Sequence, residues 1–251
     1  MRFTAARIVD LTHQIPAQRP AEAGFWLARC FEYFPPGTVH VAVVDPGVGT
    51  SRRILCASVR GHALLAPDNG LLAPVAARCG DLEVQDVGAA GLAALGIQVV
   101  SATFHGRDIF APVAAELAAG RIAPPRLGDR LPGPWTLPGS AQRAGWDLNG
   151  SVVTVDHFGN LITDIESAQL APLEDPQVTV GGLTLALRRT YGDARPGELI
   201  ALVNSFDVLE IAAAGGSAAA TLGLARGAPV LVRSLRQGVR AVGLPGGGNP
   251  L

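Results

Sequence analysis

The segment VHVAVVDPGVGTSRR, residues 39–53, constrains the fold of this chain more than any other stretch. Its first half alternates in the way that favours a β-strand, and Pro46 ends the strand because proline fixes φ and has no N–H group. Open α/β sheets gather ligand groups at the carboxyl ends of their strands. The segment therefore places the carboxylate of Asp45 where a site is expected, with Arg52 near enough along the chain to fold back on it. The alternative interpretation is a turn held by a structural ion pair.

The composition excludes several classes of function. The chain has 251 residues, 48% of them hydrophobic and 16% charged, which is enough to bury a substantial core. A formal net charge of −1 argues against nucleic-acid and membrane partners. All 20 basic residues are arginine, so a lysine Schiff base and a P-loop lysine are both excluded. The widely spaced cysteines, with no recognisable signal peptide or membrane-spanning run, predict a soluble cytoplasmic protein.

The order of the secondary-structure signals predicts an α/β protein with two domains. Strand patterns alternate with helical ones in the first half, which favours an N-terminal mostly parallel α/β sheet domain over residues 1–130. A stretch rich in proline and glycine predicts a linker over 131–145. Short β-type runs then indicate a smaller C-terminal antiparallel β domain over 146–251. Within the first domain we expect a strand at 6–12 and helices at 20–33, 71–78 and 111–119.

Two further segments carry side chains suited to chemistry or binding. His105 follows Phe104 and stands just before a predicted helix, flanked by glycine and charge; the alternative is a capping or packing histidine. The sequence DHFGN, residues 156–160, interrupts two strands. Phe158 offers a flat apolar face there, and the amide of Asn160 offers the donor and acceptor that a purine edge needs. The alternative is an ordinary hairpin turn.

Six ordered motifs together resemble one family. They are DLTHQIP (10–16), FPPGTVHVAVVDPGVGTSRR (34–53), APDNGLL (66–72), TFHGRDIFAPVAAELAAG (103–120), VDHFGNLITDI (155–165) and NSFDVLEIAAAGG (204–216). The chain is similar in these motifs to the S-adenosyl-L-methionine hydroxide adenosyltransferases. These are also called adenosine-forming S-adenosyl-L-methionine (SAM) hydrolases and are relatives of the SAM-dependent fluorinase and chlorinase.

The resemblance implies an activity, an assembly and a set of site residues. SAM would be hydrolysed to adenosine and L-methionine by water attacking ribose C5′, with SAM as the substrate and no cofactor or metal. The assembly would be a homotrimer with intersubunit active sites. The catalytic set of the hydrolases falls here on Asp45, Arg52 and His105. The resemblance places Phe158 and Asn160 at the adenine, Tyr191 or its neighbour over the base, Asp156 and Ser205 near the methionine group, and Phe104 among the substrate contacts.

One departure from the family bears on the function of this chain. Family members usually begin with a strand carrying a Thr-Asp-Phe-Gly-type motif and a helix, and the aspartate of that unit binds the ribose hydroxyls. The unit is missing here before Arg7, through a wrong start codon or a real loss, which predicts weak SAM binding and slow or absent hydrolysis. A SAM-dependent halogenase and a non-catalytic, truncated SAM- or nucleoside-binding protein are the alternatives. A charged Asp45 would repel a halide ion.

Overall fold

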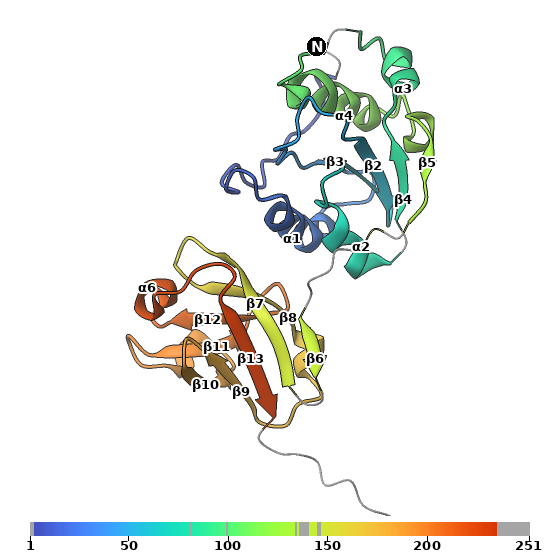
Figure 1. Ribbon diagram of the computed structural model, residues 1–251. Helices are drawn as coiled ribbons and strands as arrows, with labels where there is room; N and C mark the ends of the chain where they lie inside the picture. The colour runs from blue at the N-terminus through green and yellow to red at the C-terminus, as the bar shows by residue number, and fades with distance from the viewer. Residues whose placement is uncertain are drawn as a thin grey trace, which may run out of the picture. The chain divides into compact units, whose positions relative to one another are not determined.

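The computed structural model describes residues 3–80, 82–98, 100–133, 135, 141–144 and 147–234 of this mixed α/β protein. The chain forms two compact units, Met1–Pro138 and Gly139–Leu251, which are described separately below (Figure 1). Much of the expected linker, residues 134, 136–140 and 145, lies outside the described residues, as does 235–251 of the expected second domain. None of the helices in the described ranges has the length and apolar character needed to cross a bilayer.

The first unit contains a five-stranded sheet in the order β1-β3-β2-β4-β5 (Figure 1). Its strands span Val39–Val41 (β1), Ile54–Val59 (β2), His62–Pro67 (β3), Glu83–Asp86 (β4) and Arg130–Leu131 (β5). β1 pairs in parallel with β3, whereas the β2–β3, β2–β4 and β4–β5 pairings are antiparallel. The expectation of a mostly parallel sheet is therefore wrong. The reason is a turn of two residues, Arg60 and Gly61, both with positive φ, because so short a connection permits only an antiparallel hairpin.

Helices cover both faces of this sheet. Leu55 of β2 packs in a core cluster with residues of α1 and α2, and its neighbour Cys56 packs on the opposite face with residues of α4. Alternate side chains of a strand point to opposite faces, so β2 is buried on both. The expected helices are confirmed. The helical segments span Pro20–Cys30 (α1), Phe31–Tyr33 (η1), Ala73–Cys79 (α2), Ala89–Ala94 (α3), Gly106–Phe110 (η2), Ala111–Ala118 (α4) and Pro124–Arg126 (η3).

The strand expected at residues 6–12 is not present. The segment forms no strand pairing with the described residues, and the side chains of Ile8, Val9 and Leu11 are 82%, 53% and 50% exposed. An alternating pattern predicts a strand because one face is normally buried on a neighbour. Here no neighbouring strand among the described residues takes up that pairing, so the local preference does not become a β-strand.

The second unit is built around a ring of strands. Hydrogen bonding runs β13-β9-β10-β11-β12-β8-β7, and a β7–β13 pairing closes the ring, with β6 added outside β7. The pairings are antiparallel except β10–β11. Its strands span Gln142–Ala144 (β6), Asp147–Val155 (β7), Leu161–Glu166 (β8), Pro176–Val180 (β9), Leu183–Arg188 (β10), Leu199–Val203 (β11), Val208–Ala213 (β12) and Pro229–Ser234 (β13).

The interior of the ring is filled by apolar side chains. Leu148, Ile165 and Leu209 come from three different strands and are fully buried in one cluster. Closure leaves few free strand edges, which is how small antiparallel sheets avoid open edges. The short helical segments of this unit span Ser167–Leu170 (α5), Tyr191–Asp193 (η4) and Ala218–Leu222 (α6).

Candidate active site

Asp45 and Arg52 form a buried ion pair just beyond the end of β1. The Nε of Arg52 donates to Oδ1 of Asp45 at 2.8 Å, and its Nη2 donates to Oδ2 of the same carboxylate. The side chain of Arg52 is only 8% exposed and that of Asp45 only 5%. The turn between them is closed by the hydroxyl of Thr50, which donates to the carbonyl of Gly47 at 2.7 Å. A guanidinium that donates to both oxygens of a carboxylate is held in one orientation, so the other N–H groups of Arg52 point in fixed directions.

His105 lies beside Nη2 of Arg52, the same nitrogen that donates to Oδ2 of Asp45, whereas Nη1 donates to the carbonyl of Arg53 at 3.3 Å. Nη2 of Arg52 is 3.0 Å from Nδ1 of His105. A guanidinium can only donate, so Nδ1 must accept, and the neutral ring then carries its proton on Nε2. His105 immediately precedes a turn of π-helix, Gly106–Phe110, that continues into α4, and such turns often occur at functional sites. The structure thus brings together the three residues that the sequence singled out.

Close backbone contact joins the two loops that carry these side chains. Gly49 has φ +79°, and a Cβ built on it would stand 2.2 Å from the carbonyl oxygen of Ala102. Glycine is therefore required both by conformation and by space. The loop before His105 is held in turn by Asp108, which accepts the N–H of Ser101 at 2.8 Å. Hydrogen bonds from Arg107 and from this N–H lower the pKa of Asp108 to about 2.

Asn69 is a residue whose contribution the sequence analysis missed. It belongs to a Pro-Asp-Asn-Gly turn, which is typical of loops and gives no sign of a link to the site. Its Nδ2 donates to the carbonyl of Val44 at 2.8 Å. Val44 directly precedes Asp45, so Asn69 holds the backbone from which the Asp45 carboxylate projects.

Phe104 is a half-exposed aromatic residue that directly precedes His105. Its ring is 52% exposed, and the guanidinium carbon of Arg107 lies 4.7 Å from the ring centroid. A large aromatic side chain with half its surface exposed beside His105 offers apolar area that a flat or apolar ligand group would cover.

In the second unit, Asp156 organises the predicted binding turn. Its Oδ1 accepts the N–H groups of Phe158 and Asn160, both at 2.9 Å, and its Oδ2 accepts Nδ2 of Asn160 at 3.0 Å. Gly159 completes the turn with φ +84°. Phe158 is 74% exposed, whereas Asn160 is only 7% exposed. The turn therefore offers an aromatic face, and the carbonyl oxygen of Asn160 stays available while its amide nitrogen is held by Asp156.

Tyr191 belongs to a second polar cluster of this unit, centred on Glu210. The hydroxyl of Tyr191 donates to Oε1 of Glu210 at 2.5 Å, and Nδ2 of Asn204 donates to Oε2 at 3.1 Å. Burial, with a smaller contribution from the charge of Asp156, raises the pKa of Glu210. Burial and the bond to Glu210 raise the pKa of Tyr191 as well. Ser205 follows Asn204 and is exposed.

Glu210 was not singled out in the sequence, although a signal was present. It is the one charged residue of β12, Val208–Ala213, and every residue of that strand is buried. A carboxylate inside an otherwise apolar strand is rarely buried without a partner. The single glutamate in this apolar run was therefore a signal from which the sequence could have marked Glu210 as a candidate site residue.

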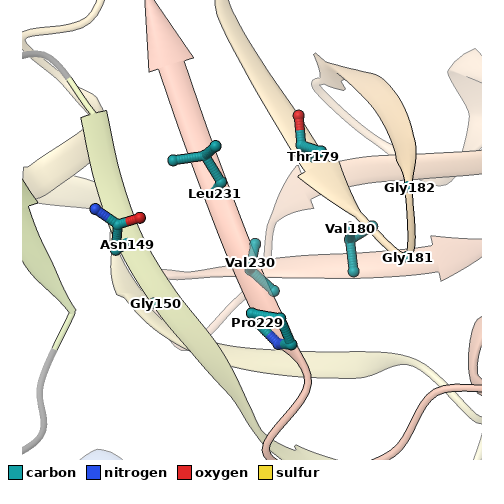
Figure 2. Close-up of a pocket in the computed structure, with 9 residues that line it drawn as sticks. All are labelled: Asn149, Gly150, Thr179, Val180, Gly181, Gly182, Pro229, Val230 and Leu231. Carbon is teal, nitrogen blue, oxygen red and sulfur yellow. The ribbon is translucent and has the colours of Figure 1, made fainter.

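A concave surface on the second unit lies apart from all of these residues. It is formed where β7, β13 and the β9–β10 turn meet (Figure 2). It is lined by Asn149, Gly150, Thr179, Val180, Gly181, Gly182, Pro229, Val230 and Leu231. None of these side chains is titratable, so the surface lacks the groups for acid–base or nucleophilic chemistry.

Comparison with known proteins places these observations in a family. Residues 2–128 match the SAM hydroxide adenosyltransferase N-terminal domain, and residues 150–231 match its C-terminal domain. An (R)-S-adenosyl-L-methionine hydrolase of Salinispora tropica is 39% identical over 235 residues, covering 88% of this chain and 84% of its own. The protein of that name from Thermus thermophilus is 40% identical over 235 residues, covering 91% and 89%.

A halogenating enzyme and a solved structure extend the comparison. A fluorinase of Nocardia brasiliensis is 27% identical over 263 residues, covering 90% of this chain and 86% of its own. A crystal structure of a conserved protein from Thermotoga maritima superposes with a TM-score of 0.82 at 35% identity, covering 91% of this chain and 89% of that one. Identity to the proteins named as hydrolases is thus well above identity to the fluorinase.

Proposed function

This chain belongs to the SAM hydroxide adenosyltransferase family, and we propose that it is an enzyme that hydrolyses SAM to adenosine and L-methionine. The observation that carries the proposal is the buried Asp45–Arg52 pair with His105 bonded to Nη2 of Arg52. Relatives that share about two residues in five with it are named as SAM hydrolases, which supports the same reaction.

For the hydrolysis of SAM, the main task of the protein is to position the attacking water. The sulfonium of SAM is already a good leaving group, and methionine departs with a neutral sulfur. We therefore propose that no cofactor takes part. Water forms the new C–O bond at C5′ as the C–S bond breaks, and the proton that the water loses passes to solvent. Holding the water in line with C5′ lowers such a barrier by several kcal/mol, up to roughly 7–11 kcal/mol in ideal cases.

His105 acts in this scheme as the group that positions the water. Its Nδ1 accepts from Arg52, so Nε2 carries the proton and donates a hydrogen bond to the water oxygen. Asp45 acts through Arg52: it neutralises the guanidinium and fixes its orientation. The pairing also bears on the halogenase alternative. Arg52 compensates the charge of Asp45, so repulsion by that carboxylate is a weak barrier to halide, and the preference for water rests on the closer similarity to hydrolases.

We place the substrate contacts on both units. Phe158 and Tyr191 supply exposed aromatic surface for the adenine, and Asn160 supplies a carbonyl oxygen that accepts from a base N–H. Phe104 supplies apolar surface beside His105, and Ser205 faces solvent for the methionine group. Asp156 acts by holding its turn, since both its oxygens are occupied.

The proposed assembly is a homotrimer in which the first unit of one subunit and the second unit of its neighbour hold one SAM. The proposal rests on the resemblance carried by the six sequence motifs. A solution mass near three times 25.8 kDa would agree with it. A strict monomer with full SAM affinity would rule it out.

The test of the function is hydrolysis in water labelled with ¹⁸O, with chloride or fluoride present. The label should appear on the 5′-hydroxyl of adenosine, and no 5′-halo-adenosine should form. His105→Ala should lower kcat far more than it weakens SAM binding, because the ring acts on water. A 5′-halo product would establish the halogenase alternative, and SAM binding without turnover would establish a binding protein.

A further inference from the structure

Glu210 is a buried carboxylate without a positively charged partner among the described residues, which lowers the stability of the fold. Its side chain is 3% exposed in the middle of a wholly buried strand, β12. None of the described residues forms an ion pair with it; its partners are the neutral donors Tyr191 and Asn204. The nearby carboxylate of Asp156 makes ionisation harder still. A buried carboxylate without a cation is expensive and is seldom retained for stability alone.

The hydrogen bonds around Glu210 are suited to the ionised form. Each carboxylate oxygen faces a donor, the hydroxyl of Tyr191 on one side and the amide of Asn204 on the other. In the ionised form both donors keep these bonds as they stand. Protonation would require the tyrosine hydroxyl to turn and accept from the carboxyl O–H, because two donors cannot face each other.

This single side chain fixes two segments of the second unit at once. Tyr191 begins the 3₁₀ turn Tyr191–Asp193 after β10, and Asn204 begins the turn between β11 and β12. Oδ1 of Asn204 accepts the N–H of Phe206 at 2.9 Å, so the orientation of the Asn204 amide sets the shape of its turn. The tyrosine ring is 46% exposed although its hydroxyl is tied inward. Its exposed face is thus held in one direction by a bond at its buried end.

We propose that Glu210 is a positioning residue for the substrate, which holds the ring of Tyr191 and the turn at Asn204 in the arrangement that receives the nucleoside. The proposal rests on the hydrolase function above. It predicts a division of effects: replacing Glu210 weakens substrate binding, while the chemical step, carried out at His105, continues at its normal rate.

The test compares Glu210→Gln, Tyr191→Phe, the double variant and Glu174→Gln, an exposed glutamate of the same unit, as control. Glutamine keeps the shape of the side chain and can donate to the tyrosine oxygen, so the fold is retained. Glu210→Gln should raise KM for SAM and Kd for adenosine about 10-fold, as expected when hydrogen bonds to a charged carboxylate are replaced by bonds to a neutral amide, with kcat within about twofold of wild type. The melting temperature should stay level or rise, since a costly buried charge is removed.

The double variant tests the link between the two residues. If Glu210 acts through Tyr191, adding Tyr191→Phe to Glu210→Gln should cost little more than the larger single effect. Fully additive losses would overturn the proposal, as would a Glu210→Gln protein that binds like the Glu174→Gln control. Parallel loss of melting temperature, kcat and affinity would show a merely structural residue and would also overturn it. Failure of the hydrolase function looks different, because wild type and the Glu174→Gln control would then both fail to hydrolyse SAM, whereas failure of the present proposal leaves their hydrolysis intact.

Discussion

Nη2 of Arg52 donates to Nδ1 of His105 across 3.0 Å, while Nε and the same Nη2 hold the two carboxylate oxygens of Asp45. The bond from Arg52 orients the histidine ring, and the buried pair with Asp45 orients Arg52. Arg52 cannot turn without breaking that pair. This relationship assigns the ring proton to Nε2, the nitrogen left for the water. In the proposed mechanism Asp45 therefore acts through Arg52 rather than on the water.

Arg52→Lys should separate charge from geometry. A lysine keeps the positive charge but cannot bond both oxygens of Asp45 and also reach His105. We expect kcat to fall by about 100-fold, the size of effect that a small misplacement of a reacting group causes. The measurement is steady-state hydrolysis of SAM.

The neighbouring residue provides the matched control. Arg53 pairs with Asp68 at the surface, where the two side chains are 47% and 26% exposed. Arg53→Lys should leave kcat near that of wild type, since exposed pairs contribute little. If Arg52→Lys were as active as Arg53→Lys, orientation of His105 by the guanidinium would not matter.

The sequence was sufficient to single out Asp45, Arg52 and His105, which lie together, but not to predict the sheet around them. The spacing of Asp45 and Arg52, beside a strand-ending turn, pointed to the ion pair because that contact is local. The β2–β3 hairpin was missed because Arg60-Gly61 lacks the Asn-Gly or Asp-Gly signature of such turns. The partners of Glu210 were hidden for another reason: Tyr191 and Asn204 come together through the pairing of β10, β11 and β12, and no local pattern records that pairing.

His40 should make the stability of the protein depend on pH. It is buried on β1 with its Nε2 3.2 Å from Nδ1 of His62. Burial first, and the charge of His62 second, lower the pKa of His40 from 6.5 to about 4. Between these values the unfolded chain binds a proton that the folded protein excludes, so stability falls as pH decreases through this window. Each kcal/mol lost lowers the melting temperature by about 2–4 °C.

Thermal melts from pH 7 to pH 4 would measure this dependence. His40→Gln keeps a polar partner for His62 but cannot be protonated, so its melting temperature should fall less over the range. His13→Gln is the control, because His13 is 84% exposed. Equal slopes for wild type and His40→Gln would mean that His40 titrates alike in the folded and unfolded states.

Tyr191 gives an optical measure of its contact with Glu210. The chain has two tyrosines, so Tyr33→Phe leaves the phenol of Tyr191 as the one signal in an alkaline ultraviolet titration. Burial and the bond to Glu210 raise the pKa of this phenol. Glu210→Gln in the same background should move its ionisation to lower pH, since a neutral partner opposes the phenolate less than a carboxylate does. An unchanged midpoint would place the hydroxyl away from Glu210.

Gly49→Ala should displace the loop of His105 from the turn of Arg52 without changing any of the three side chains proposed to be catalytic. A Cβ at this position meets the carbonyl oxygen of Ala102 at 2.2 Å, and that backbone cannot yield as a flexible side chain would. The loop bearing His105 must therefore shift away from the turn that holds Arg52. Gly37→Ala is the matched control: Gly37 also has positive φ, at +90°, but a Cβ there meets nothing within 4 Å.

Both alanine variants carry the strain of a left-handed residue, about 1 kcal/mol or somewhat more. Both should thus lose a few degrees of melting temperature, while the Gly49→Ala variant alone should lose kcat, by about 100-fold. The comparison separates strain from displacement, because strain is common to the two and displacement is not. If Gly49→Ala and Gly37→Ala hydrolysed SAM equally well, the contact with Ala102 would not be what keeps Arg52 and His105 in register.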